Sequence, residues 1–299
     1  MQKLLRFRLT NPVLVKEFRG RMRTMKTPLL LAAYLLIVGG ITFGYMYIRY
    51  SNQTYYRPGE SKDLFLMLAV LQLILIGFVA PGLTAGTISG ERERQTLNIL
   101  LTTHLSPTKI VLAKMVSSLA FIGLLVFSTL PVYAIVFLYG GISPGQMFGV
   151  FVMYLVSMLL FGSIGMFCSA WFKRTGVSTV LAYGVSLFML GGTALLAVFI
   201  SEYLNMYQYR VYGQHVGYPN LFYLTALNPV LNLISLFEPS AVMMGQNGSV
   251  SPQQGIPIQP TLYYSLVYIP VSALLLFFSV RMVAPVKKKL FRRRSAGGQ

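Results

Sequence analysis

The chain has 299 residues, of which 55% are hydrophobic and only 11% are charged. A soluble domain carries about 25% charged residues, so this composition excludes a soluble domain and indicates an integral membrane protein. The net charge of +18 would suggest nucleic acid in a soluble chain, but here the basic residues lie between long apolar stretches, and we expect no nucleic-acid partner.

The N-terminal segment, up to residue 27, predicts a short amphipathic helix. Asn11-Pro12 suits a helix start, because Asn caps well and Pro fits the first turn. Leu14, Phe18 and Met22 then recur on one face, and the basic residues lie largely away from it. Such a helix lies in the membrane interface, where its simplest role is to anchor the chain before the first span.

Six apolar stretches are long enough to cross a membrane as helices of roughly 20 residues. They cover residues of about 28–48, 64–87, 110–139, 146–171, 177–200 and 261–283. Their central regions contain no Asp, Glu, Lys, Arg or His, which counts against a proton- or sodium-driven carrier. The predicted fold is therefore an all-α membrane domain of six spans over residues 28–283.

The distribution of basic residues predicts the orientation of the chain. Of the 25 Lys and Arg residues, 21 fall before the first span, around the loops after the second and fourth spans, or around the end of the last span and the tail. By the positive-inside rule, both termini are cytoplasmic, which requires an even number of spans. The tail, residues 284–299, contains two basic triplets that are expected to attract anionic membrane lipids.

Small residues line the end of the second predicted span. Gly82, Gly86 and Gly90 recur at a spacing of four, just after Pro81, so on a helix they form one smooth strip. Such a strip permits close contact between helices. It predicts either ordinary packing or a moving gate beside the segment that follows.

Residues 89–102 predict a short helix on the cytoplasmic side. Ser89 suits the N-cap, and Glu91 and Glu93 fall in the first turn, where negative charge is favourable. Leu97 begins an apolar stripe that continues with two further leucines, 100 and 101. We expect this stripe to face the membrane domain and the charged face to point toward solvent or a partner.

A long segment, residues 201–260, precedes the last span and is expected on the outer side. It is rich in aromatic residues, which predict either an interfacial aromatic belt or an exit surface for an amphipathic substrate. Within it, the apolar run Leu221–Phe237 is broken by Asn228-Pro229. We expect a re-entrant or interfacial segment here; a spanning pair and a simple outer loop are the alternatives.

The charged segment, together with Ser106-Pro107 and Lys114 downstream, resembles the coupling segment of ABC-2 type transporter permeases. In that family the segment commonly reads Glu-basic-Glu-x-Gly-Thr-Leu-Glu, followed by a Thr/Ser-Pro turn and a Lys. Gln95 and Asn98 stand where the family often has Gly and Glu, and we expect Gln95 to make the helix more continuous, since Gly disfavours helix by about 1 kcal/mol. The residues that match the motif are Glu91, Arg92, Glu93, Arg94, Thr96 and Leu97.

This resemblance implies the permease subunit of an ATP-driven exporter in the plasma membrane of a bacterial cell. The implied partners are two ABC ATPase subunits and a second permease subunit, identical or not. The N-terminal helix would be the family's elbow helix, and the Asn228-Pro229 pair resembles an Asn-Pro found before the last span in some branches. ATP is expected on the partner alone, because this chain has no Gly-x-x-x-x-Gly-Lys-Ser/Thr loop, and no other cofactor is expected.

Two other functions remain open at the level of sequence. One is a secondary transporter or channel with sites lined by backbone groups. The other is a membrane enzyme that modifies lipids, which would need converging acids or histidines. The only histidines are His104 and His215, which are far apart in sequence and predicted on opposite sides of the membrane, and the single cysteine, Cys168, lies in an apolar stretch. A zinc enzyme is therefore not expected.

Overall fold

The structure is a computed structural model that describes residues 20, 26–51, 60–97, 106–138, 141–212, 225–238 and 259–284. Within these ranges every regular element is helical. The predicted elbow helix with Leu14, Phe18 and Met22, and the basic tail, lie outside the described residues.

Six helical stretches are long and apolar enough to cross a membrane, which confirms the six spans expected from the sequence. The described helices are α3 (Lys26–Tyr50), α4 (Glu60–Thr84), α5 (Ser89–Glu93), α7 (Pro107–Ser128), α8 (Leu130–Leu138), α9 (Pro144–Trp171), α10 (Thr175–Leu187), the π-helical turn η1 (Phe188–Gly192), α11 (Thr193–Tyr212), α13 (Pro229–Ser235) and α14 (Pro260–Val283).

Two spans differ from the expectation in detail. The third consists of α7 and α8, because the helix is interrupted at Thr129, two residues before Pro131. Proline has no N–H to donate and crowds the preceding turn, so Pro131 accounts for the interruption at Thr129. The fifth consists of α10, η1 and α11, and its helix runs on to Tyr212, well past the boundary at residue 200. The beginning of the expected outer segment is therefore helical.

Proline also marks where helices begin. It is the first residue of α7, α9, α13 and α14, a position where its missing N–H leaves no hydrogen bond unmade. Ser106, Ser143 and Asn228 precede three of these prolines, and their side chains accept hydrogen bonds from backbone N–H groups of the first turn. The expected Ser106-Pro107 turn is thus the start of α7.

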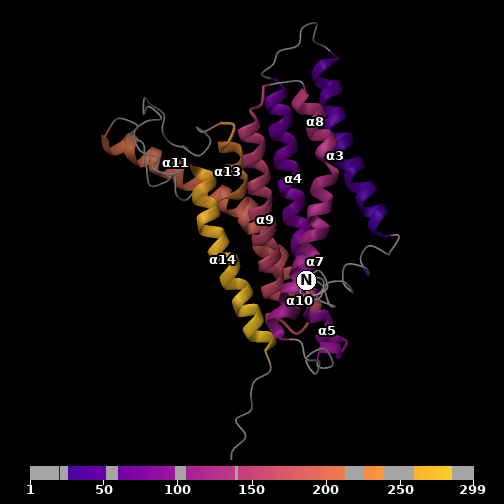
Figure 1. Ribbon diagram of the computed structural model, residues 1–299. Coiled ribbons are helices and arrows are strands. Elements are labelled where there is room, and N and C mark those ends of the chain that lie inside the picture. Colours follow the sequence, from indigo (N-terminus) through magenta and orange to yellow (C-terminus); the bar gives the residue numbers. More distant parts are fainter. Residues whose placement is uncertain are drawn as a thin grey trace, which may run out of the picture.

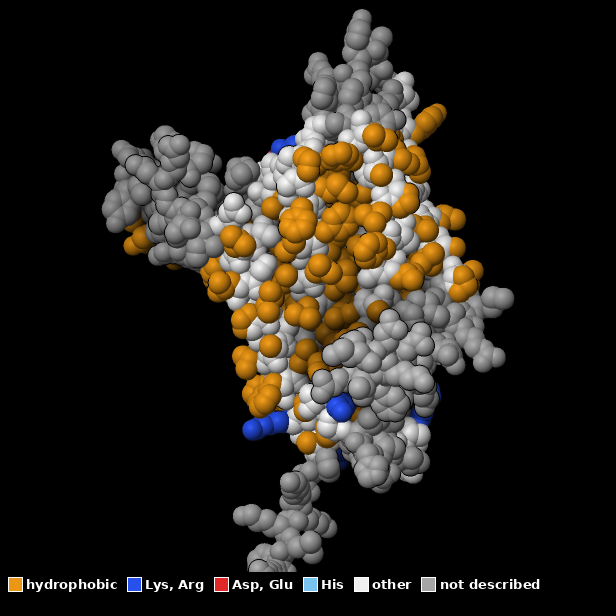
Figure 2. All heavy atoms as spheres, in the orientation of Figure 1, with side chains coloured by type: hydrophobic (Ala, Val, Ile, Leu, Met, Phe, Trp, Pro, Cys, Tyr) orange, Lys and Arg blue, Asp and Glu red, His pale blue; other side chains and the backbone are white. Residues whose placement is uncertain are grey.

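The helices pack around α4 and α9, the two most buried spans. Both α4 and α14 pack along α9, and α7 and α10 complete the contacts at the end that carries α5 (Figure 1). Figure 2 shows hydrophobic side chains along the visible face, with most of the visible Lys and Arg side chains near that same end. This distribution suits a body that lies in lipid and has polar surfaces at its ends.

The short helix α13 lies at the opposite end from α5 (Figure 1). It packs against α4, α9, η1 and α14 and is largely buried. Seven residues of helix extend about 10 Å, which is too short to cross a hydrocarbon core of about 30 Å. From η1, α11 leans away from the other helices (Figure 1).

Candidate functional site

The second span does not continue directly into α5, because residues 85–88 form turns between the two helices. The Ser169 hydroxyl oxygen on α9 accepts from two backbone N–H groups at this break, those of Ile88 at 2.8 Å and Ser89 at 3.0 Å. The Ser178 hydroxyl on α10 donates to the carbonyl oxygen of Ala85 at 2.7 Å. Side chains from two other spans therefore satisfy backbone groups that an unbroken helix would have paired internally.

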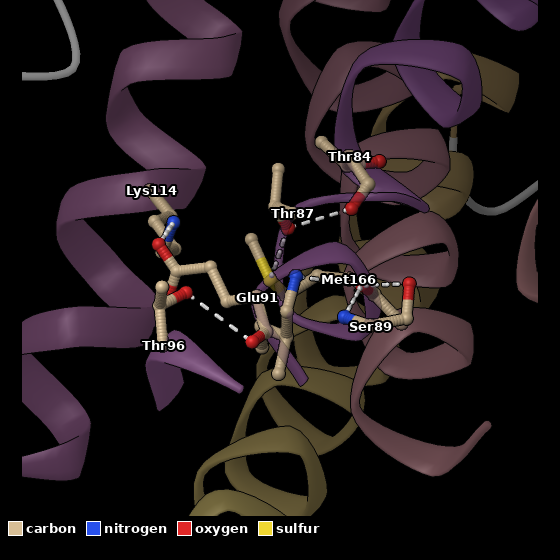
Figure 3. A network of polar contacts seen from close by, with 9 residues as sticks. Thr84, Thr87, Ser89, Glu91, Thr96, Lys114 and Met166 are labelled. Carbon is tan, nitrogen blue, oxygen red and sulfur yellow. Dashed lines mark hydrogen bonds and ion pairs between the residues drawn. The ribbon is translucent and has the colours of Figure 1, made fainter. Parts of the chain in front are cut away.

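Ser89 does not cap the helix, contrary to the expectation from sequence. It is the first residue of α5, and the N-cap position belongs to Ile88, which makes no side-chain capping bond. The Ser89 hydroxyl instead donates back to the carbonyl oxygen of Ala85 at 3.1 Å and lies 3.3 Å from the Ser169 hydroxyl oxygen. The serine therefore belongs to the hydroxyl network at the break (Figure 3).

Glu91 pairs with a lysine on the neighbouring span α7. The Lys114 ammonium lies 2.8 Å from the Glu91 carboxylate, and Figure 3 shows the two side chains reaching toward each other. The Lys114 side chain is only 4% exposed and that of Glu91 is 24% exposed. A charge with so little access to water depends on its partner, so this pair joins α5 firmly to α7.

Arg92 binds the end of α9. Its guanidinium donates to the carbonyl oxygens of Ala170 at 3.2 Å and Phe172 at 3.4 Å. The last carbonyls of a helix have no partner within that helix, and they form the negative end of its dipole. A cation is therefore favourable at this position, and α5 is joined to α9 as well as to α7.

Glu93 binds the start of α10. Its carboxylate accepts from the Thr175 backbone N–H at 2.9 Å and from the Thr175 hydroxyl. The N-cap residue of α10, Arg174, provides no side-chain capping bond, so Glu93 supplies one from another part of the chain. The Thr175 hydroxyl and then its N–H lower the pKa of the Glu93 carboxyl, because both bonds favour the charged form.

These contacts correct the expected direction of the charged face. Three consecutive side chains, Glu91, Arg92 and Glu93, turn toward α7, α9 and α10 instead of pointing only to solvent or a partner. The exposed residues at this end of α5 are Glu93 itself and the next three, Arg94, Gln95 and Thr96.

The expectation that Gln95 prolongs the helix is wrong. Gln95 has φ of 58°, the left-handed conformation, and α5 has already ended at Glu93. Glycine adopts this conformation without steric cost. This gives a physical reason for the Gly that often stands at this position in the permease motif. The Thr96 hydroxyl then donates to the carbonyl oxygen of Glu91 at 3.2 Å.

Leu97 lies against the spans. It is 8% exposed and belongs to an apolar cluster with residues from α7, α9 and α14, among them Val111, Met166 and Val283. This contact holds the segment after α5 against the bundle. The other two leucines of the expected stripe, at positions 100 and 101, lie outside the described residues.

The glycine strip faces α10. An added Cβ at Gly82 would meet the hydroxyl of Tyr183, and one at Gly86 would lie 3.2 Å from the methyl group of Thr175. Gly90 is less tight, with its nearest contact at 3.8 Å. These positions allow α10 to lie close beside α4 and α5.

A second close approach lies on the other side of α4. A Cβ at Gly165 of α9 would meet the Thr84 hydroxyl and would lie 3.1 Å from Pro81 Cα and 3.2 Å from Ala85 N. Two of these three atoms are backbone atoms, one in α4 and one in the residue that follows it, and backbone cannot rotate aside. The break after α4 is therefore enclosed by tightly packed helices on two sides.

Asn228, before Pro229, connects α13 to the π-helical turn at the end away from α5. Its carboxamide oxygen accepts from the backbone N–H groups of Val230 and Leu231, both at 2.8 Å. Its amide nitrogen donates to the carbonyl oxygen of Leu190 at 2.9 Å. The same nitrogen lies 3.2 Å from the carbonyl oxygen of Met189 and 2.7 Å from the hydroxyl of Thr193. One side chain thus begins α13 and binds η1.

Sequence reasoning missed Ser169, Ser178 and Thr175. Each contacts the α4–α5 region across roughly eighty residues or more of sequence. Serine and threonine inside an apolar stretch give a weak local signal, because they also bond to carbonyls of their own helix. Within the described part of the chain, no three His, Cys, Asp or Glu residues come together as a possible metal site.

Comparison with known proteins agrees with this architecture. The family model described as ABC-2 family transporter protein matches residues 12–286, which is most of the chain. A search of curated proteins found no match. On the basis of the family match, the chain belongs to the ABC-2 transporter family and is a multi-pass membrane component of a transporter.

Proposed function

We propose that this chain forms the translocation path of an ATP-driven exporter and that α5 couples it to a separate ATPase subunit. Membership of the ABC-2 family supports an ABC ATPase as the partner. The observation that carries the proposal is the contact pattern of α5, in which three consecutive charged side chains bind three different spans. A partner that moves this five-residue helix acts on α7, α9 and α10 together.

The partner surface proposed here is the exposed turn after α5. Arg94, Gln95 and Thr96 are exposed, whereas Leu97 and the neighbouring Ser89 are buried against the spans. In this scheme ATP binding closes the ATPase and displaces the turn. The pairs made by Glu91 and its two neighbours carry the displacement into the bundle.

The path of the movement follows the break at residues 85–88. Hydroxyls from α9 and α10 hold the backbone N–H groups of Ile88 and Ser89 and the carbonyl oxygen of Ala85 there. Gly82 and Gly86 give α10 a smooth surface beside α4. We propose that α10 shifts along this glycine strip when α5 moves, so that the strip with Pro81 acts as the gate.

The remaining parts of the proposal concern assembly and orientation. Two copies of the permease, identical or different, combine with two ATPase subunits in a bacterial plasma membrane. Both termini and α5 lie in the cytoplasm, with the basic tail near lipid headgroups and the N-terminal elbow helix in the membrane interface. The segment around Asn228-Pro229 enters the membrane from the outer side. Nucleotide binds only to the ATPase, since this chain contains no phosphate-binding loop.

The test is co-expression with the cognate ATPase followed by purification and measurement of ATP turnover. Arg94→Glu is expected to lower the amount of ATPase that co-purifies and the response of its turnover to the permease. Lys173→Glu is the matched control, because Lys173 is an exposed cation at the same end but lies between α9 and α10, outside the turn that follows α5. ATP hydrolysis by the isolated chain, or wild-type copurification of the Arg94 variant together with unchanged turnover, contradicts the proposal. Transport by the chain with no ATPase present would instead support a secondary transporter or channel.

A further inference from the structure

A groove lies on the side of the bundle between the third span, α7 with α8, and α9. Its volume is about 320 Å³, and its lining consists of glycine, aliphatic, aromatic and methionine side chains from these three helices. Phe127 on α7 and Phe148 and Leu155 on α9 form exposed parts of its walls, at 71%, 71% and 64% exposure.

The Tyr154 hydroxyl, which could anchor the polar group of a ligand, is already hydrogen-bonded within the protein. Tyr154 lines the groove, but its hydroxyl donates to the carbonyl oxygen of Ala69 at 3.0 Å and lies 2.6 Å from the Tyr133 hydroxyl. It therefore presents its ring to the groove and its oxygen to the protein interior. The groove offers an apolar ligand dispersion contacts alone.

The length of the groove along α9 matches the thickness of one leaflet of a bilayer. The lining residues of α9 run from Phe148 to Met158, and α9 begins at Pro144 at the end away from α5. Ten helical residues extend about 15 Å, and the first of them lies only about 6 Å along the helix from its start. A hydrocarbon core is about 30 Å thick, so the groove extends through roughly half of it. A spanning helix from a second copy of the chain is about twice as long as this groove.

Gly123 makes the groove deep. A Cβ added at this position of α7 would meet no heavy atom within 4 Å, although the residue is partly covered by its neighbours. The lining therefore has free space at Gly123 that a larger side chain could fill without a clash. A methylene chain, which is narrow and flexible, suits such a space.

We propose that this groove binds one acyl chain of a membrane phospholipid in the leaflet away from α5. The chain lies along α9 between the aromatic walls and occupies the space beside Gly123. This site does not depend on the ATPase proposed above, and its test uses the permease alone, so either proposal can fail without the other.

The test uses the full chain in phosphatidylcholine vesicles that contain a phosphatidylcholine with a photoactivatable diazirine on one acyl chain. After illumination, peptide mass spectrometry locates the attached lipid. We expect attachment to concentrate on α7 and α9 around Phe127 and Leu155, and to fall by roughly fivefold or more in Gly123→Phe, because the added ring replaces several buried methylene groups. Gly184→Phe is the control, since Gly184 also has no heavy atom within 4 Å of an added Cβ but lies on α10.

Phe127→Ala provides a second variant that opens the wall instead of filling the groove, and it is expected to weaken labelling at Leu155. The proposal is overturned if attachment follows exposure evenly over all the spans, or if Gly123→Phe and Gly184→Phe give the same pattern as wild type. It is also overturned if Gly123→Phe separates a dimer and leaves lipid labelling unchanged, because the groove would then be an interface between two copies.

Discussion

The pair of Glu91 and Lys114 offers the sharpest test of how α5 is held. Glu91→Gln removes the negative charge that lies 2.8 Å from the Lys114 ammonium, whose side chain is only 4% exposed. Removing one partner of a buried ion pair costs about 3–5 kcal/mol, and the partial exposure of Glu91 places this case near the lower end. About 3 kcal/mol corresponds to a change on the order of 100-fold in the folding equilibrium.

Lys114→Met should cost less than Glu91→Gln. The Glu91 side chain that it leaves is 24% exposed against 4% for Lys114, so its carboxylate reaches water by a smaller movement, although its oxygen Oε2 is buried in this structure. The double variant should recover most of the stability, because an uncharged pair of similar size leaves no buried charge. In all three variants the charged connection between α5 and α7 is absent, so we expect reduced modulation of the ATPase even where stability is normal.

The assay measures the fraction of chain that remains monodisperse after heating in lipid nanodiscs, together with ATP turnover of the co-purified ATPase. The expected order of stability is wild type, then the double variant, then Lys114→Met, then Glu91→Gln. The reasoning is refuted if Glu91→Gln is as stable as wild type, since the ion pair would then contribute nothing. A stable double variant with normal coupling would show that the pair has a structural role alone.

Three further predictions concern the break and the turn around α5, all measured by thermal stability in nanodiscs. Ser169→Ala should lower the free energy of unfolding by about 1–3 kcal/mol or more, because two buried backbone N–H groups lose their acceptor. Ser169→Thr retains the hydroxyl and should have a stability closer to wild type. Equal stability of the two variants would contradict this reasoning. Gly165→Leu should prevent normal packing of α9 on α4, since backbone atoms lie in the way. Gly184→Leu, at an open position, should be tolerated. A Gly165→Leu variant more stable than Gly184→Leu would be incompatible with the packing described. Gln95→Gly should stabilise by about 1 kcal/mol, because glycine relieves the left-handed conformation, and a loss of stability would argue against that conformation.

The spans could be predicted because the signal for them is local. A stretch of about 20 apolar residues predicts a spanning helix without any information from distant residues, and all six predicted spans are present in the structure. The turn at Ser106-Pro107 was predictable for the same reason, since the capping bond joins residues three apart. The third span was expected to be continuous, and its interruption two residues before Pro131 differs from α14, whose helix continues through Pro270.

The contacts of α5 could not be predicted in this way. Composition indicated a charged helix beside the membrane, but the partners of Arg92 and Glu93 lie about eighty residues away on α9 and α10. The error at Gln95 has a different origin. Helix propensity alone favoured a continuous helix, and the packing of Leu97 against the spans overrides it, because the chain must turn to bury that side chain.

The π-helical turn η1 also sets the rotational phase of everything that follows it. The Thr193 N–H donates to the carbonyl oxygen of Phe188, five residues earlier, so this turn accommodates one residue more than an α-helical turn. Each residue of an α-helix advances the chain by about 100° around the axis. Loss of a single residue here would restore an ordinary helix but rotate the exposed tyrosines of α11, including Tyr203 and Tyr209, by more than a quarter of a circle. The directions in which these tyrosines point are thus set by one inserted residue in η1, whose carbonyl oxygens bind the Asn228 amide.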